Sequence, residues 1–178
     1  MTQYNLDNRI REYGFEDFKW IAGEDIVVRQ WVRFKCQMMC SGYNNSAMCP
    51  PNMPSIDECR RFFSEYRTVA VIHEQIVSEN DEDDEVLLGT VDQDLLALER
   101  QLFLDGYYKT IALPMTVCYR CDPCTGDLST CRHKDTSRPN PEALGVDVFA
   151  TVRRIGYPVE VLTDYHDWMN RYALVLIE

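Results

Sequence analysis

This chain lacks the features of several common classes of protein. No apolar run in its 178 residues comes near the roughly 20 residues that a membrane-spanning helix needs. The first residues have neither the basic segment nor the apolar run of a secretory signal. No P-loop, G-x-G-x-x-G or G-x-S-x-G motif occurs, so nucleotide-binding folds of those kinds and serine hydrolases have no support. We therefore expect a cytoplasmic protein with no membrane partner.

Positive charge is also scarce. Lys and Arg number 18 against 29 Asp and Glu, which gives a formal net charge of −11 at pH 7. A field of that sign repels a phosphate backbone, and we expect no nucleic-acid partner. Apolar residues make up 46% of the chain, which is enough for one hydrophobic core. We expect a single domain over residues 1–178.

The apolar pattern predicts helices that alternate with short strands. The expected helices are 6–13, 56–66, 91–106 and 141–155, and the expected strands are 68–72, 109–113, 159–162 and 172–177. This alternation favours an α/β fold in which helices pack on a small mixed sheet.

Three further segments are predicted to have other structures. The runs 18–22 and 26–34, separated by Gly-Glu-Asp at 23–25, are expected to form a β-hairpin. The acidic run 78–85 has no apolar periodicity and is expected to be a solvated loop. The interval 114–140 has little periodicity, which is unusual inside a compact domain unless something else orders it.

The eight cysteines are the most informative residues. Their share of the chain is below the roughly 8–10% that marks a disulfide scaffold, and a reducing compartment would keep them as thiols. Metal ligation or thiol catalysis is then the expected use. We expect two cysteine-rich metal-binding loops, which would make the chain a single metal-binding domain.

The more specific group lies in the interval 114–140. It consists of Cys118, Cys121 and Cys124, which are three residues apart, and of Cys131, which follows after six more residues. This spacing lets the four sulfur atoms surround one centre. Such closely repeated spacing is typical of ferredoxin-like [4Fe–4S] loops, whereas structural zinc more often uses two separated C-x-x-C knuckles. The interpretation as buried or unpaired thiols has little support on a polar loop. Iron–sulfur and zinc both stay open.

The second group is looser and contains Cys36, Cys40, Cys49 and Cys59. Cys49 precedes a proline, as cluster ligands do in bacterial ferredoxins. Cys59 fits two interpretations equally well, because it shares an apolar helix stripe with Ile56 and Phe63, where a small thiol is an ordinary core residue. If Cys59 is not a ligand, a cluster held by Cys36, Cys40 and Cys49 would have one iron atom without a protein ligand. His73 and His166 belong to no recognisable motif.

Several of these motifs together resemble a known family. They are the run Cys-Pro-Pro-Asn-x-Pro-Ser at 49–55, the stretch C-x2-C-x2-C-x6-C-Arg-His at 118–133, and the run from 138 to 153. Over most of its length the chain resembles a family of bacterial and archaeal predicted metal-binding proteins, domain of unknown function 2284. The resemblance implies metal or iron–sulfur binding and assigns no reaction.

Three functions follow as hypotheses. The first is an iron–sulfur protein with one or two [4Fe–4S] clusters, in electron transfer or another redox role with an unknown redox protein as partner. The second is an iron–sulfur enzyme whose open iron, on the loop of Cys36, Cys40 and Cys49, binds a small-molecule substrate. The third is a zinc-stapled module for protein interaction. The sequence identifies no catalytic residue.

Overall fold

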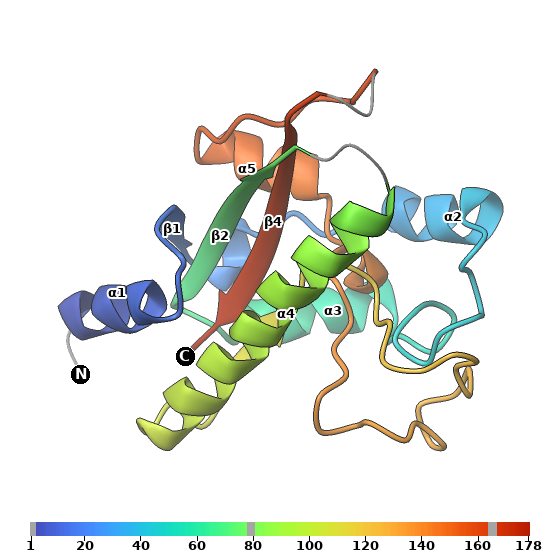
Figure 1. Cartoon of the computed structure of the whole chain (residues 1–178), viewed down its shortest axis with the longest axis horizontal. Coiled ribbons are helices and arrows are strands. Elements are labelled where there is room, and N and C mark those ends of the chain that lie inside the picture. Colours follow the sequence, from blue (N-terminus) through green and yellow to red (C-terminus); the bar gives the residue numbers. More distant parts are fainter. Residues whose placement is uncertain (1–2, 78–80, 164–166) are drawn as a thin grey trace.

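The computed structural model describes residues 3–77, 81–163 and 167–178, and for residues 3–4 and 81–87 it describes the backbone alone. Figure 1 labels the main elements. The helices are α1 (Gln3–Glu12), α2 (Gln30–Met39), α3 (Ile56–Ser64), α4 (Asp81–Leu104) and α5 (Val148–Arg154), with 3-10 turns η1 (Gly23–Asp25) and η2 (Glu142–Leu144). The strands are β1 (Phe18–Ile21), β2 (Val69–Ile76), β3 (Ile111–Leu113) and β4 (Met169–Leu176).

The strands of the described residues form one four-stranded sheet in the order β1-β2-β4-β3. Every neighbouring pair is antiparallel. The expected α/β fold is confirmed, but the strand directions differ from those of a mixed sheet. The reason lies in β4: β2 and β3 run in the same direction with α4 as their connection, and β4 enters between them in the opposite direction.

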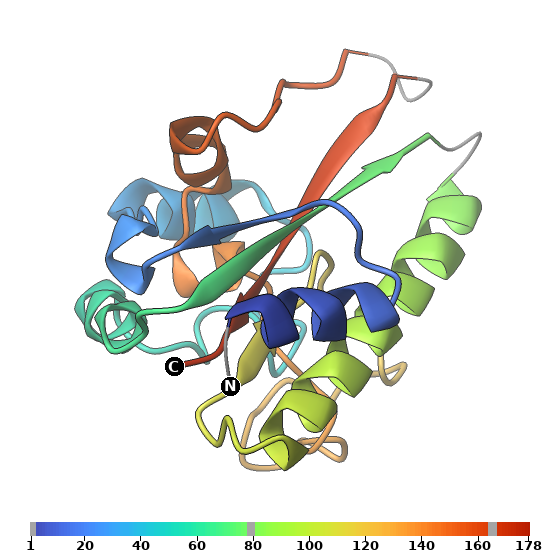
Figure 2. The ribbon, with the colours of Figure 1, turned by 90° about the vertical axis from the view of Figure 1, so that its left-hand side faces the viewer.

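The sheet is covered by helices on both faces (Figure 2). Side chains alternate along β2, so that Val69 and Val71 face one core while Ala70 and Ile72 face the other. Helices α1 and α4 cover the face of Ala70, and α3 and α5 cover the face of Val69. Burial on both sides explains the apolar runs at 69–72 of β2 and 173–176 of β4.

The expected hairpin is wrong. Residues 23–25 form η1, the chain continues into α2, and β1 pairs with β2 instead of with residues 26–34. Gly23 donates its amide to the carbonyl of Tyr66 at 2.8 Å, and a Cβ at this position would lie 1.9 Å from the carbonyl oxygen of Phe63. This close approach fastens η1 to the end of α3, which directs the chain away from a hairpin.

Two expectations about the acidic run and the following helix are also wrong. Residues 81–85 belong to α4, while 78–80 lie outside the described residues. The helix therefore begins well ahead of residue 91, its expected start. The physical reason is that Leu88 extends the buried stripe of Leu95, Leu98 and Leu102 toward the N-terminus of α4. Phe103, next to Leu102 in sequence, lies on the outer side of α4 and is 56% exposed.

The region from 141 onward is more broken than the sequence indicates. Gly145, with φ +78°, separates η2 from α5, and Asp147 begins α5 by accepting from the amide of Ala150 at 2.9 Å. Residues 159–162 form no strand within the described part of the chain, since Val159 is buried in the core but Val161 is 79% exposed. The predicted last strand is confirmed as β4. No described helix is long and apolar enough to cross a membrane.

Candidate functional site

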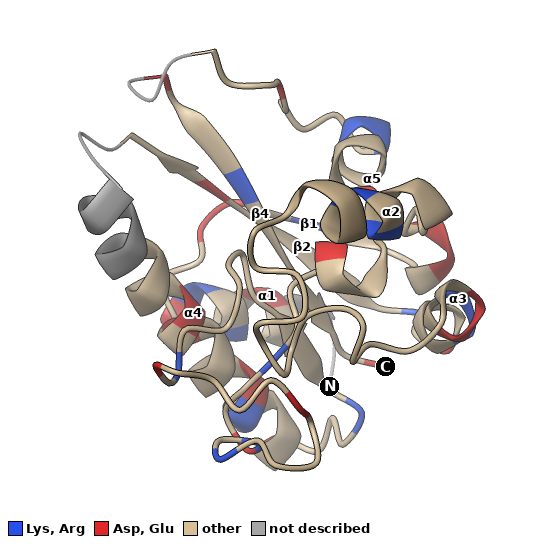
Figure 3. Ribbon diagram, turned by 90° about the vertical axis from the view of Figure 1, so that its right-hand side faces the viewer, with Lys and Arg blue, Asp and Glu red and all other residues tan. Residues whose placement is uncertain are grey.

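The candidate site is built from two stretches of chain that lie against each other. We define the first cysteine segment as residues 36–52 and the second cysteine segment as residues 118–138. The first segment begins in the last turn of α2; beyond Met39 both segments follow irregular paths, and Figures 1 and 3 show them next to one another. The Asn52 side chain donates to the carbonyl oxygens of Ser46 at 3.2 Å and Gly126 at 2.9 Å, which ties the two segments together.

The second cysteine segment brings its four thiols together in two pairs. Cys118 and Cys131 both donate to the hydroxyl of Ser137, at 3.5 and 3.9 Å from sulfur to oxygen. Ser137 is only 4% exposed, so this meeting point is buried. Cys121 and Cys124 form the other pair, since each thiol acts on the pKa of the other. The four thiols thus lie as two pairs, and a single centre shared by all four stays a prediction.

The two thiols of the second pair have opposite electrostatic surroundings. Backbone amides of Gly126 and Ala47 point at the sulfur of Cys124 and lower its pKa. Desolvation, followed by the neighbouring charge of Cys124, raises the pKa of Cys121. Cys124 is thus the member of the pair that forms a thiolate more readily.

The first cysteine segment begins on α2. Cys36 and Cys40 are four residues apart, one turn along α2 and its C-cap, so they lie on the same side. Burial, followed by the charge of Cys40, raises the pKa of Cys36. Burial also raises the pKa of Cys49, and charges on Cys40, Cys36 and Cys118 act in the same direction. The pKa of Cys49 is therefore affected by thiols of its own segment and by Cys118 of the second segment.

Cys59 is placed differently. It lies on the buried face of α3, it is 1% exposed, and its sulfur lies 3.6 Å from the carbonyl oxygen of Pro54. Burial raises the pKa of its thiol. Its hydrogen bond goes to a backbone carbonyl, and the charges that act on it are those of Arg33 and Glu58. Its environment is that of a core residue.

The second cysteine segment is anchored to α4 through charged and polar contacts. Arg138 holds Glu99 with two hydrogen bonds, of 3.0 and 2.5 Å. Asp92 accepts from the amide of Met115 at 3.0 Å and from the hydroxyl of Thr116. A cavity of about 130 Å³ lies between these residues, lined among others by Asp92, Cys118, Arg120 and Arg138.

The donor atoms fit a thiolate-bound metal, although they are not gathered around one point. All eight cysteines are free, and thiolates are the preferred ligands of iron–sulfur clusters and of structural zinc. Among the described residues no three Cys, His, Asp or Glu side chains are placed to hold a metal ion. One carboxylate oxygen, Oε2 of Glu142, is buried without a hydrogen-bond partner beside Cys36 and Cys40, as expected of an unused ligand.

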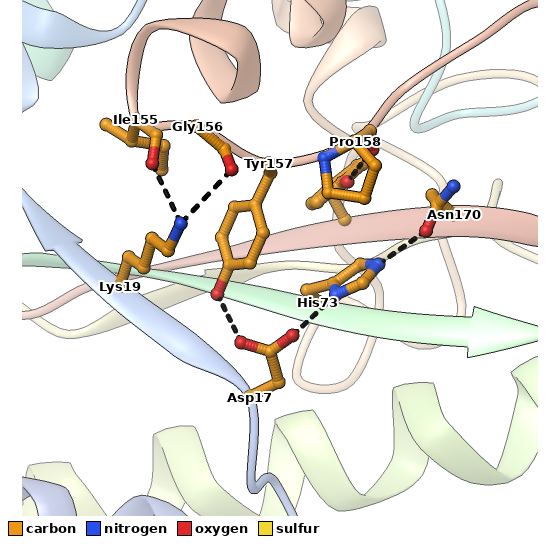
Figure 4. A network of polar contacts seen from close by, with 9 residues as sticks. Asp17, Lys19, His73, Ile155, Gly156, Tyr157, Pro158 and Asn170 are labelled. Atoms are coloured by element: carbon orange, nitrogen blue, oxygen red, sulfur yellow. Dashed lines mark hydrogen bonds and ion pairs between the residues drawn. The ribbon is translucent and has the colours of Figure 1, made fainter.

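A polar network that no sequence motif indicated surrounds His73 of β2 (Figure 4). His73 lies between Asp17, with Nδ1 and Oδ2 2.7 Å apart, and Asn170, with Nε2 and Oδ1 2.8 Å apart. Tyr157 donates to the other oxygen of Asp17 at 2.7 Å, and the ring of Tyr172 stacks on that of His73. Both nitrogens of His73 are engaged, so the network is built to hold strands and loops together. His166 lies outside the described residues.

Comparison with known proteins gives one match. A family model with the description Predicted metal-binding protein (DUF2284) matches residues 19–177. No curated protein and no solved structure matches the chain. The matched range contains both cysteine segments and all of the described sheet except Phe18.

Proposed function

This chain belongs to the DUF2284 family of predicted metal-binding proteins, and we propose that it binds metal as an iron–sulfur protein with a redox or electron-transfer role in the cytoplasm. The second cysteine segment would hold a [4Fe–4S] cluster through Cys118, Cys121, Cys124 and Cys131. A second centre would use Cys36, Cys40 and Cys49. A redox protein would be the partner.

One observation carries the proposal: Cys118 and Cys131, which are 13 residues apart, both contact the buried hydroxyl of Ser137. A polar segment with no helix or strand gains little by placing two thiols against one buried hydroxyl unless those thiols share a use. The segment is also long and irregular, and a bound cluster would supply the order that secondary structure does not.

The three-residue spacing favours iron–sulfur over zinc. Ligands at 118, 121 and 124 follow the repeated C-x-x-C pattern of [4Fe–4S] loops. Backbone amides at Cys124 also fit an anionic cluster, since amide hydrogen bonds to sulfur stabilise negative charge there.

The test is anaerobic purification followed by analysis of iron, sulfide and zinc and by a visible spectrum. We expect iron and sulfide in equal amounts, and a broad thiolate-to-iron band at roughly 400 nm. The variant Cys121→Ser should lose the cluster of the second segment, while Cys59→Ser, the matched control, should keep it. Colourless protein that contains only zinc and unfolds when zinc is removed would establish the zinc-stapled module instead.

The placement of Cys59 favours a second candidate, an iron–sulfur enzyme. Because Cys59 lies in the core, the first segment offers three thiols, and a three-thiolate cluster leaves one iron for a small-molecule substrate. Exogenous anions or thiols should then change the spectrum of wild-type protein. A spectrum that such ligands leave unchanged would argue against this candidate.

A further inference from the structure

Glu142 occupies a fixed position beside the helix that carries Cys36. It begins η2, whose turn is closed by a hydrogen bond from the amide of Gly145 to the carbonyl of Glu142 at 2.9 Å. Gly145 has φ +78°, and a Cβ there would lie 2.4 Å from Cδ1 of Ile56. The next carbonyl, that of Ala143, accepts from Arg33 of α2 at 3.0 Å. The backbone of Glu142 is thus held against α2.

One oxygen of the Glu142 carboxylate has no hydrogen-bond partner among the described residues. This oxygen, Oε2, is buried. Burial raises the pKa of Glu142, and the charge of Arg171 opposes this without a hydrogen bond between the two side chains. A buried acceptor that lacks a donor costs free energy, about 1–3 kcal/mol for a typical group.

The same carboxylate shares a cavity with two thiols. The cavity has a volume of about 330 Å³ and is lined by Glu142, Cys36 and Cys40, with Lys35 and apolar side chains around them. The charge of Glu142 reaches Cys36, because it raises the pKa of that thiol. Cys59, the other candidate for a fourth position, lies in the core with its sulfur at the carbonyl of Pro54.

We propose that Glu142 is the non-sulfur ligand of the metal centre formed by Cys36, Cys40 and Cys49. The inference rests on the proposed function and completes its ligand set. A carboxylate oxygen is an ordinary ligand for zinc and for non-haem iron, so a set of three thiolates and one carboxylate suits either metal. The bound cation would supply the partner that Oε2 lacks.

The test compares Glu142→Gln with wild-type protein, with Cys49→Ser as the reference and with Glu160→Gln as the control on an exposed glutamate. Each protein is made metal-free under argon and titrated with Co²⁺, whose visible bands report the number and type of ligands. Release to a chelator is then timed. In Glu142→Gln we expect altered bands and release at least about tenfold faster than in wild type.

A second measurement separates ligation from a structural role. Thermal unfolding of the metal-free proteins should show Glu142→Gln to be as stable as wild type or more stable, because the substitution removes a buried, unpaired carboxylate. If metal-free Glu142→Gln is less stable and its Co²⁺ bands match those of wild type, Glu142 is structural and the inference is overturned.

The two proposals fail in distinguishable ways. Wild-type protein that takes up no metal in either segment would remove the proposed function and this inference with it. Wild-type protein that binds metal, and loses it in Cys49→Ser but not in Glu142→Gln, would overturn the inference while the proposed function stands. If Glu142→Gln and the control Glu160→Gln release metal at the same rate, the inference is likewise overturned while the proposed function stands.

Discussion

The backbone amide of Ala47 donates a hydrogen bond to the sulfur of Cys124 at 3.4 Å, across 77 positions of sequence. This contact joins the first cysteine segment to the second at a thiol that the proposed cluster uses. The same amide lowers the pKa of Cys124. The two segments therefore form one structural unit, and a change in one should be measurable in the metal of the other.

Removing the side chain that ties the segments should weaken metal retention. Asn52→Ala deletes two hydrogen bonds, to Ser46 and Gly126, and should lower the free energy of unfolding of metal-free protein by about 1–3 kcal/mol. Metal release to a chelator should become faster. The control is Asn45→Ala, whose amide bonds only within the first segment, to Ser41. Equal release from both variants would contradict the coupling of the segments.

The hydroxyl shared by Cys118 and Cys131 should tune the proposed cluster. Once these thiols become thiolates, Ser137 can only donate to them, and a donated hydrogen bond stabilises the reduced, more negative cluster. Ser137→Ala is therefore expected to lower the reduction potential, measured by a dye-mediated redox titration. Ser64→Ala, whose hydroxyl bonds to the carbonyl of Arg61 on α3, should leave the potential unchanged. An unaltered potential in Ser137→Ala would remove Ser137 from the cluster's surroundings.

Alkaline pH should destabilise the fold through Tyr172. Burial, followed by the charge of Asp17, raises the pKa of Tyr172 to about 12, against roughly 10 in an unfolded chain. The folded state thus favours the neutral phenol, so this stabilisation is complete below pH 10 and is lost as pH rises through 12.

Tyr172→Phe tests that linkage. It removes the hydrogen bond from the phenol to the carbonyl of Pro158, which should cost about 0.5–1.5 kcal/mol at neutral pH. Between pH 10 and 12 its unfolding free energy should decline less steeply than that of wild type, by about one proton. Denaturant unfolding monitored at several pH values gives both quantities. Identical slopes would assign the alkaline loss to other groups, of which Tyr157, with its raised pKa, is the first to examine.

The core on the side of α3 should depend on Phe63. This side chain is 1% exposed and packs with Phe62 and with Ile21 and Val69 of the sheet. Phe63→Ala should lower the free energy of unfolding by about 3–5 kcal/mol, because a buried aromatic leaves a cavity. Phe103→Ala, at a 56% exposed position on α4, should change it by about 0.5 kcal/mol or less. A loss under 1 kcal/mol for Phe63→Ala would contradict this packing.

The local signals of the sequence were sufficient for some elements. Ser55 and Glu58 predict a capped helix, and the structure contains the full reciprocal cap, with the Ser55 amide 2.8 Å from the Glu58 carboxylate. Gly14 and Gly106 predict helix ends and have positive φ. These predictions succeed because each depends on atoms a few residues apart.

Other elements depended on partners far away in sequence. The run 26–34 has strand-like composition, yet part of it is helix, since β1 finds its partner at residues 69–72. Gly145 divides an apolar pattern that reads as one helix, because η2 must fit against Ile56 and Arg33. His73 acquires its partners only when Asp17 and Asn170 arrive from other strands and loops.

The sequence by itself determined the chemistry of this protein: thiols in two groups, family membership, and helices and strands in an α/β arrangement. Its evidence is residue type and spacing, and both are local. Only the tertiary structure decided which groups meet. It set Cys59 in the core, joined Cys124 to Ala47, and left the Glu142 carboxylate unpaired beside Cys36 and Cys40. These relations arise from the packing of segments distant in sequence, which residue spacing along the chain does not encode.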